Sequence, residues 1–443
     1  MVESKIYLVL FIIKPYKIIF DLIVLLSIII LIPSFISAAE KGSNNDRNKN
    51  GYRIGFLPVL SFNSDEGFGF GIIAQVDEYG NDKLPYLTSH RIIIKRSSGG
   101  TSEYSYRFDS KYLMPKDLRI TLQIKYKASK LEPFHGFGGA QTKYDEAFTN
   151  PNSGGPFRGN FYYNYDKNYF RINTILQGNI YENKFRWLGG FSIMNTKNDT
   201  IKYSEFEKDL VGTSTESLLA NLQVSGIIDQ GIFEGRNENS FLIGIVLDTR
   251  DDEITPSKGV WTEALLRWVP NFSVNDFSYV SLTSTYRSYI PIKEHLTLAL
   301  RLSGRLMSNG APFFSVSQQE SSFKMIDGLG SNKTIRGILY LRILSRNNLF
   351  GNIELRYKIR KMFKSGYAAL SSFYDFGRSF DSTPILPTVD VGTKYDKLHQ
   401  GVGAGFRVAL NASFVVAADM GFALDSKTDG KGIRLYLGLD WLF

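Results

Sequence analysis

The sequence predicts an all-β protein, a sixteen-stranded antiparallel transmembrane β-barrel. Aromatic residues make up 14% of the 443 residues and are accompanied by 40 glycines, which favours many strands and turns over helices. Apolar and polar residues alternate along most of the chain after Gly51. The apolar fraction of 43% argues against a bundle of membrane-spanning helices, each of which needs about 20 apolar residues. The chain contains no cysteine, which excludes disulfides and thiolate metal sites.

The N-terminal region differs from the rest, and residues 1–39 are predicted to be a secretory signal peptide. A basic flank, an apolar stretch over 22–34 and small residues up to Ala39 follow the layout of such a signal. A retained membrane anchor is the alternative, because the apolar stretch is long. Residues 40–50 are polar and are predicted to form a flexible lead-in. The barrel domain is therefore predicted over 51–443.

The alternation has the period of a β-strand. In 296–303, leucine occupies every second position and polar or small residues occupy the others, so a strand there has one apolar and one polar face. A soluble β-sandwich also alternates in this way. Two features favour a membrane barrel: predicted strands of about 10–12 residues, and aromatic residues near strand ends, where interfacial girdles lie. Examples are Trp261, Trp268, Trp441 and Phe443.

The number of predicted strands is even, as in bacterial single-chain barrels. The stretch 129–239 is the least regular. The sixteen predicted strands span 52–61, 66–77, 86–97, 102–112, 117–128, 160–172, 183–196, 240–250, 259–269, 276–290, 295–307, 348–360, 365–376, 400–411, 413–423 and 432–443.

Four short segments carry a more specific signal. In chain order they are Asp248-Thr249-Arg250-Asp251 before Pro256-Ser257-Lys258-Gly259, then Arg336-Gly337, then Phe373-Tyr374-Asp375-Phe376-Gly377, then Gly401-Val402-Gly403-Ala404-Gly405. Each is weak alone. Their order and spacing, with a terminal Phe, resemble the BamA/TamA-like barrels of the outer-membrane assembly and translocation superfamily, also called bacterial surface antigen proteins. The resemblance is clear over about 240–443 and looser over 51–239.

The resemblance implies that the long connection over 308–347 folds back into the lumen. Alternation places Glu354 and Asp375 on the inward faces of their strands, so Arg336 would bridge one or both carboxylates through its planar fork. Gly337 would let the backbone pass closely. We name Arg336, Gly337, Glu354 and Asp375 the loop–lumen lock. The alternative is that these charges are ordinary lumen residues of a water-filled barrel.

Two further sites are predicted near the C-terminus. Gly401, Gly403 and Gly405 share the inward face and would form a glycine groove in which a loop can rest. Trp441 and Phe443 end an alternating strand that looks like the recognition signal of the cell's barrel-assembly machinery, so the chain is expected to be a client of that machinery. The acidic cluster Asp248 to Asp252 is interpreted as a solvated turn rather than a functional group.

The sequence departs from the family pattern in two places. Only about a dozen residues lie between the predicted signal and the first strand, where family members usually carry periplasmic POTRA domains. Ile338 follows Arg336-Gly337, where the family usually has an aromatic residue. The resemblance implies an outer-membrane protein that assists insertion or translocation of proteins, or lipids, with a separate POTRA-like partner. The alternative is a passive pore or surface antigen that keeps only the scaffold.

A weakly paired seam between the first and last strands would serve the first of these functions. Gly55 and Pro58 lie in the first strand, and proline cannot donate a hydrogen bond to a neighbouring strand. No catalytic, cofactor or metal site is predicted, because none of the four histidines lies near a serine and acid pattern. The net charge of +9 is spread along the chain, which argues against nucleic acid and suits lipopolysaccharide phosphates.

Overall fold

The computed structural model describes most of the region after Gly51. The predicted signal peptide and lead-in, residues 1–50, lie outside the described residues and stay predictions, as does the position of Trp441. Within 51–443, the positions not described are 65, 81–85, 113–117, 183, 210–213, 254, 323–324, 363–365, 382–394, 410–414 and 440–442.

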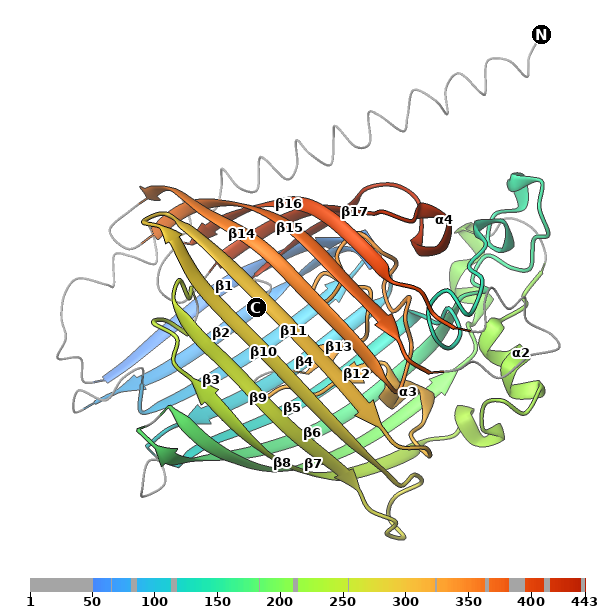
Figure 1. Ribbon diagram of the computed structural model, residues 1–443. Helices are drawn as coiled ribbons and strands as arrows, with labels where there is room; N and C mark the ends of the chain where they lie inside the picture. Colours follow the sequence, from blue (N-terminus) through green and yellow to red (C-terminus); the bar gives the residue numbers. More distant parts are fainter. Residues whose placement is uncertain are drawn as a thin grey trace. The chain divides into compact units, whose positions relative to one another are not determined.

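Sixteen strands in the described part of the chain close into an antiparallel barrel (Figure 1), which confirms the predicted fold class. Neighbours in sequence are neighbours in the sheet, and pairing of β1 with β18 closes it. The barrel strands are β1 (Gly51–Asn63), β2 (Gly67–Tyr79), β3 (Thr88–Ser97), β4 (Thr101–Ser110), β5 (Arg119–Pro133), β6 (Asn164–Tyr181), β7 (Phe185–Asp199), β8 (Arg236–Asp248), β9 (Gly259–Val269), β10 (Tyr279–Lys293), β11 (Leu296–Met307), β14 (Asn348–Met362), β15 (Gly366–Ser379), β16 (His399–Ala409), β17 (Val415–Ala423) and β18 (Arg434–Leu439).

Short elements lie in the connections between these strands. Two of them, β12 and β13, form a hairpin in the connection from β11 to β14. The short elements are η1 (Glu146–Phe148), η2 (Pro151–Ser153), η3 (Tyr203–Asp209), α2 (Leu218–Val224), η4 (Gln230–Phe233), α3 (Phe313–Val316), β12 (Gln318–Gln319), β13 (Ile326–Asp327) and α4 (Ser426–Asp429). None of the helices in the described ranges has the length and hydropathy required to cross a membrane.

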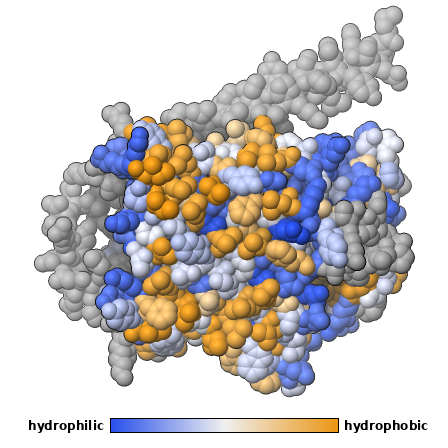
Figure 2. All heavy atoms as spheres, viewed as in Figure 1, coloured by the Kyte–Doolittle hydropathy of each residue, from blue (hydrophilic) through white to orange (hydrophobic). Residues whose placement is uncertain are grey.

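The distribution of side chains between the two faces separates a membrane barrel from a soluble sandwich. In β10, Leu282 is 44% exposed on the outer face, whereas Thr283 is fully buried on the inner face. Val280 and Tyr286 share the outward face and are also exposed. A soluble sheet would bury the leucine and expose the threonine, so this pattern is that of a lipid-facing surface. Figure 2 shows hydrophobic residues spread over the visible outer surface of the strands.

The structure corrects two of the sequence predictions in the barrel wall. Strand β6 runs over Asn164–Tyr181, nine residues past the predicted end at 172. Trp261 is fully buried on the inner face, where its ring lies under the guanidinium of Arg287 at 4.1 Å. Trp268 faces outward, as a girdle residue would. The two tryptophans are an odd number of positions apart, so one strand cannot present both to lipid.

The connections differ in length at the two ends of the barrel. The turns after β6 and β10 are short, whereas those after β5, β7 and β11 are long. Outer-membrane barrels have short periplasmic turns and longer external loops. The long connections, which hold α2 and α4, therefore mark the external end (Figure 1).

Candidate functional site in the barrel interior

The connection between β11 and β14 contacts inward-facing side chains from several strands. Arg305 of β11 donates to the carbonyl oxygens of Val316 and Ser345 in the connection, the first at 2.7 Å. Ser322 N–H donates to Glu263 of β9 at 2.9 Å. Further along, Asn352 of β14 donates to the carbonyl of Thr334 at 2.6 Å. Side chains of the strands thus form hydrogen bonds with backbone groups of the connection. Without these bonds, the polar backbone atoms of this buried segment would lack partners.

The same connection holds an ion pair between Glu320 and the wall. Arg267 of β9 donates to Glu320 at 2.7 Å and to Glu238 of β8 at 2.5 Å. All three side chains are less than a tenth exposed. An arginine between two carboxylates supplies several donors in one plane, so this cluster fastens the connection to β8 and β9.

Arg336 is fully buried and meets both carboxylates that the sequence analysis named. Its Nε and Nη2 donate to the two oxygens of Asp375 at 2.7 and 3.0 Å, and its own backbone N–H donates to Asp375 Oδ2 at 3.0 Å. Its Nη1 donates to Glu354 Oε2 at 3.0 Å. The two-bond contact with Asp375 uses the planar fork that a lysine does not have. The structure thus places the four residues of the loop–lumen lock together, and its role stays a proposal.

The surroundings of Arg336 balance its charge. The Arg336 guanidinium lies 3.4 Å from the ring centre of Phe373, and Asp419 of β17 is 3.6 Å away. Glu354 also accepts from Arg356 at 2.9 Å, and Arg407 lies 2.7 Å from Asp419. Three arginines thus face the three carboxylates of Glu354, Asp375 and Asp419. Buried charges persist only when they are paired in this way.

Two glycines, one in the loop and one in the barrel wall, let the loop backbone approach the wall closely. Gly337 has a φ of 92°, and a Cβ there would lie 2.6 Å from the backbone of Phe422. Its N–H donates to the hydroxyl of Tyr436 in β18 at 3.1 Å. A Cβ at Gly401 would overlap the carbonyl oxygen of Arg336. Only glycine allows this closeness at both positions.

The other two glycines of the predicted groove receive different neighbours. A Cβ at Gly403 would overlap the carbonyl oxygen of Met420 and the ring of Phe373, and one at Gly405 would overlap Asp419. Only Gly401 of the three therefore lies directly under the loop. The remaining two make room for the side chains that surround Arg336.

Several residues of this site were absent from the sequence prediction. Asp419 is an acid in an otherwise apolar stretch, and Phe373 shares the inward face with Asp375, so both carried a usable signal. Tyr436 alternates with the apolar residues of the last strand but had no predicted partner. Which arginine or loop amide each would meet depends on the fold of the connection, which alternation does not encode.

The side chain of Phe443 points into the barrel and not outward as predicted. Its ring is buried beside Tyr289 and lies 4.8 and 5.0 Å from the guanidinium groups of Arg301 and Arg356. Arg356 also donates to the carbonyl oxygen of Phe443 at 3.1 Å. These partners are inward-facing, whereas the sequence analysis placed Phe443 on the outward face. Strand β18 ends at Leu439, so the alternation of a strand no longer decides where Phe443 points.

The acidic segment after β8 is a structured turn. Arg250 donates to both carboxylate oxygens of Asp248 at 2.9 Å. Asp251 accepts the backbone N–H groups of Ser257 and Lys258 at 2.9 and 3.1 Å. Carboxylates that accept neighbouring backbone N–H groups stabilise turns, which agrees with the interpretation of this cluster as a turn.

At the external end, connections from different parts of the chain are joined. Gly138 and Leu344 exchange backbone hydrogen bonds at 2.7 and 3.0 Å. Arg342 donates to the carbonyl oxygens of Thr428 and Thr142 at 2.8 and 2.9 Å. An apolar cluster, here called the external cap, fills the space between the connections. Its buried members are Phe134, Phe148, Tyr162, Tyr163, Tyr165, Met194, Leu218, Leu219, Leu222, Ile228, Ile232, Val269, Tyr279, Met307, Phe313, Phe314, Val316 and Leu344.

His399 has two acidic neighbours at this end of the barrel. Its Nε2 lies 2.8 Å from Asp396, and its Nδ1 lies 2.5 Å from Asp429 of α4. Asp396 also accepts the backbone N–H of Ala140 at 2.7 Å, so this group ties three connections together. The sequence placed an acid three residues before His399 but gave no sign of Asp429. Among the described residues, no cluster of histidine and acidic side chains is arranged to hold a metal ion.

His135 is buried against the external cap. Its ring centre lies 5.5 Å from that of Tyr144 and 5.4 Å from that of Tyr163. Burial, together with the positive charges of Arg342 and Arg434, lowers the pKa of His135 to about 3. The folded cap therefore holds His135 in its neutral form, because protonation would place a positive charge in an apolar site.

Acidification is expected to loosen the external cap through His135. A histidine with a pKa of about 3 when folded and 6.5 when exposed costs nothing above pH 6.5. As the pH falls below 6.5, the opened state takes up a proton that the folded state excludes, so the cap loses stability. The protection factors of the amides over residues 134–163, which correct the exchange rates for their intrinsic pH dependence, should therefore fall between pH 7 and about pH 5. His135→Gln, which does not titrate, should show a smaller pH dependence; an equal dependence would assign the effect to other groups.

Comparisons with known proteins agree with this architecture. Residues 92–441 match the Omp85 superfamily domain. BamA from Haemophilus ducreyi lacking POTRA domains 1–3 is similar in structure, with a TM-score of 0.54 and 10% identity, over 89% of this chain and 71% of that one. CdiB from Escherichia coli gives a TM-score of 0.51 and 10% identity, over 89% and 68%. No curated protein matches the sequence significantly.

At such identities the two structures support the fold alone, whereas the domain match spans most of the chain. Barrels of this superfamily lie in the outer membrane, insert or translocate other proteins with the help of partner proteins, and are not enzymes. The sixteen strands, the buried Arg-Gly segment and the domain match over residues 92–441 lead to one assignment: the chain belongs to the Omp85 superfamily.

Proposed function

We propose that this barrel assists the insertion or translocation of proteins at the outer membrane, and that it does so through the seam between β1 and β18. The observation that carries the proposal is the pairing at this seam. All thirteen residues of β1 pair with β2. Among the described residues of β1, only Phe62 and Asn63 pair with β18, opposite Leu437 and Tyr436, and Ser64 next to them exchanges two hydrogen bonds with Leu435.

Within the described residues, the part of β1 before Phe62 has no partner on β18, and its outward side chains are more exposed than those of β2. Ile54 in β1 is 77% exposed, whereas Ile72, on the outward face of β2, is 42% exposed. Tyr52 and Phe56 are more than half exposed as well. An unpaired strand edge offers a row of hydrogen-bonding groups that pair readily with an incoming strand. A client strand that pairs with β1 would thus satisfy groups that the barrel itself leaves open.

The interior contacts support a barrel that keeps its shape while the seam is weak. Arg336 is fixed to β14 and β15, and Gly337 to Tyr436 in β18. The loop–lumen lock therefore links the last strand to the stable part of the wall. In this proposal, the contacts of the connection between β11 and β14 stabilise the closed barrel, because the residue pairs between β1 and β18 are few.

The proposal includes a separate periplasmic partner with POTRA-like domains, because superfamily barrels work with partner proteins. Lipids remain a second class of cargo. Exposed lysines on the external connections, such as Lys431, would attract lipopolysaccharide phosphates in the surrounding outer membrane.

A disulfide across the seam tests the proposal, because the chain contains no cysteine of its own. Phe62→Cys with Leu437→Cys joins two facing positions of an antiparallel pair, where the Cα separation suits a disulfide. Vesicles that contain the reduced variant should speed the folding of a urea-denatured eight-stranded barrel, measured by its mobility shift on a semi-native gel. Oxidation should return the folding rate to that of empty vesicles, and a reductant should restore it.

The matched control shares one of the two cysteines. Phe62→Cys with Phe68→Cys joins β1 to β2 and leaves the seam free, so its oxidation should not change the rate. If the reduced variant and the parent chain give no acceleration, the barrel is a passive pore or surface antigen. If both disulfides reduce the rate equally, the seam has no special part in the activity.

A further inference from the structure

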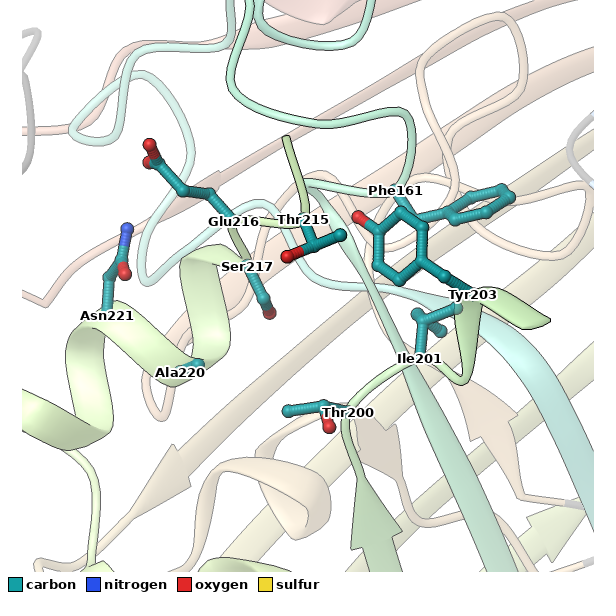
Figure 3. A pocket seen from close by; sticks show the side chains of 9 residues that line it. All are labelled: Phe161, Thr200, Ile201, Tyr203, Thr215, Glu216, Ser217, Ala220 and Asn221. Atoms are coloured by element: carbon teal, nitrogen blue, oxygen red, sulfur yellow. The ribbon is translucent and has the colours of Figure 1, made fainter. Parts of the chain in front are cut away.

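A pocket opens between two connections at the external end, away from the lumen lock. It encloses about 400 Å³, within the range of small-molecule sites. Figure 3 shows its lining residues. They come from the connection between β5 and β6 and from the connection between β7 and β8. The lining residues are Phe161, Thr200, Ile201, Tyr203, Thr215, Glu216, Ser217, Ala220 and Asn221.

The two connections are bonded to each other along the pocket, so the pocket is preformed. Gly159 and Thr215 form an isolated antiparallel bridge. The N–H of Glu216 donates to the carbonyl of Arg158 at 3.2 Å, and the N–H of Leu218 donates to that of Tyr162 at 2.9 Å. A site that is ordered before a ligand arrives loses less entropy on binding.

One polar atom of the pocket lacks a partner among the residues that the structure describes. Ser217 is 9% exposed, and its hydroxyl forms no hydrogen bond to any of them. Ser217 precedes α2, but its side chain does not cap that helix. Figure 3 places Ser217 and Thr215 on the side of the pocket that leads into α2, across from Thr200 and Ile201. A buried hydroxyl without a partner is costly, and a ligand that bonds to it would remove that cost.

The remaining lining narrows the chemistry of such a ligand. Phe161 and Tyr203 lie next to each other, with ring centres 5.5 Å apart, and give the pocket an aromatic wall. Thr200 and Thr215 add hydroxyls, which both donate and accept, whereas the side chain of Asn221 already bonds to Tyr162. The lining contains one carboxylate, Glu216, and no cation, which disfavours phosphate or sulfate. A neutral sugar ring offers what this wall requires: C–H groups for the aromatic face and hydroxyls that both donate and accept.

We propose that this pocket binds a neutral saccharide unit at the external end of the barrel, with Ser217 as a hydrogen-bonding residue and Tyr203 as part of the stacking wall. The site is separate from the seam and the loop–lumen lock, so it adds a recognition function to the barrel. Glycans at a cell surface present such units. The proposal rests on the lining residues and does not depend on insertion activity.

Saturation-transfer difference NMR on the refolded full chain tests the proposal. The detergent should be an amine oxide, since maltoside detergents carry a sugar headgroup themselves. The probes are the methyl glycosides of glucose, galactose, mannose and N-acetylglucosamine, each up to about 10 mM to reach millimolar dissociation constants. Glucose 6-phosphate and glucosamine serve as charged comparisons. At least one neutral glycoside should give signals from its ring protons, and the charged sugars should give none.

Two variants show whether the signal comes from this pocket. Ser217→Ala removes a hydroxyl that makes no bond to the described residues, so the fold should be unaffected and the affinity should fall about tenfold. Ser153→Ala, in the connection between β5 and β6, removes an exposed hydroxyl that is not part of the pocket lining and should leave binding unchanged. Absence of a signal for every neutral glycoside would overturn the proposal. Equal binding by the parent and Ser217→Ala, or a preference for a charged sugar, would overturn it as well.

Discussion

Arg336→Ala is expected to destabilise the barrel by about 3–5 kcal/mol, because it leaves buried carboxylates without their partner. Arg336 is fully buried and donates to Asp375 through two nitrogens and to Glu354 through a third. Removing Arg336 leaves two arginines to face three buried carboxylates. The urea concentration at which the folded band disappears from a semi-native gel should therefore fall markedly. Protease cleavage within 308–347 should increase at the same time.

Three comparisons make this result specific to the loop–lumen lock. Arg336→Lys keeps the charge but not the planar fork, so it should recover only part of the lost stability. Lys184→Ala removes an exposed cation paired with Glu182 and should cost less than about 1 kcal/mol. Asp375→Asn should be less harmful in the Arg336→Ala background than alone, since the two residues interact. If the Arg336→Ala chain is as resistant to urea as the parent chain and its protease cleavage is unchanged, the loop–lumen lock does not stabilise the barrel.

Gly401→Ala is expected to displace the loop through a single methyl group. Its Cβ would overlap the carbonyl oxygen of Arg336, which is a backbone atom and cannot move aside as the end of a flexible side chain can. Overpacking of this kind costs about 1–3 kcal/mol. The urea midpoint should fall, and single-channel recordings in a planar bilayer should show larger and more frequent openings than the parent chain, because the loop sits less firmly in the lumen.

Gly438→Ala is the matched control for this substitution. It adds the same methyl group to β18, two strands away from β16, where a Cβ would meet nothing within 4 Å. Its urea midpoint and currents should equal those of the parent, apart from the small effect of alanine in a strand. If Gly401→Ala and Gly438→Ala behave alike, the close approach of the loop to β16 has no energetic importance.

Alternation accounts for how much of this site was predictable. A strand presents every second residue to the same face, so the sequence alone assigns Glu354 and Asp375 to the inward face. The same rule applied more strictly would have placed Phe373 beside Asp375 and Trp261 away from the lipid girdle. It gives no help with Phe443, which follows the end of β18. It also gives no indication that His399, at the start of β16, meets Asp429 in the connection after β17.

The sequence by itself determined the two faces of each strand, the number of strands and hence the barrel, because these follow from a local period of two residues. The positions of long connections were equally local, since they lie where the alternation stops. Only the tertiary structure decided which distant groups meet: Arg336 with Asp419 and Gly337 with Tyr436 in the lumen, and Ser217 with Phe161 at the external pocket. It also decided how little of β1 is paired with β18 among the described residues. Such contacts join residues far apart in the chain, and their free energy depends on barrel closure and loop packing, which no local pattern of residues records.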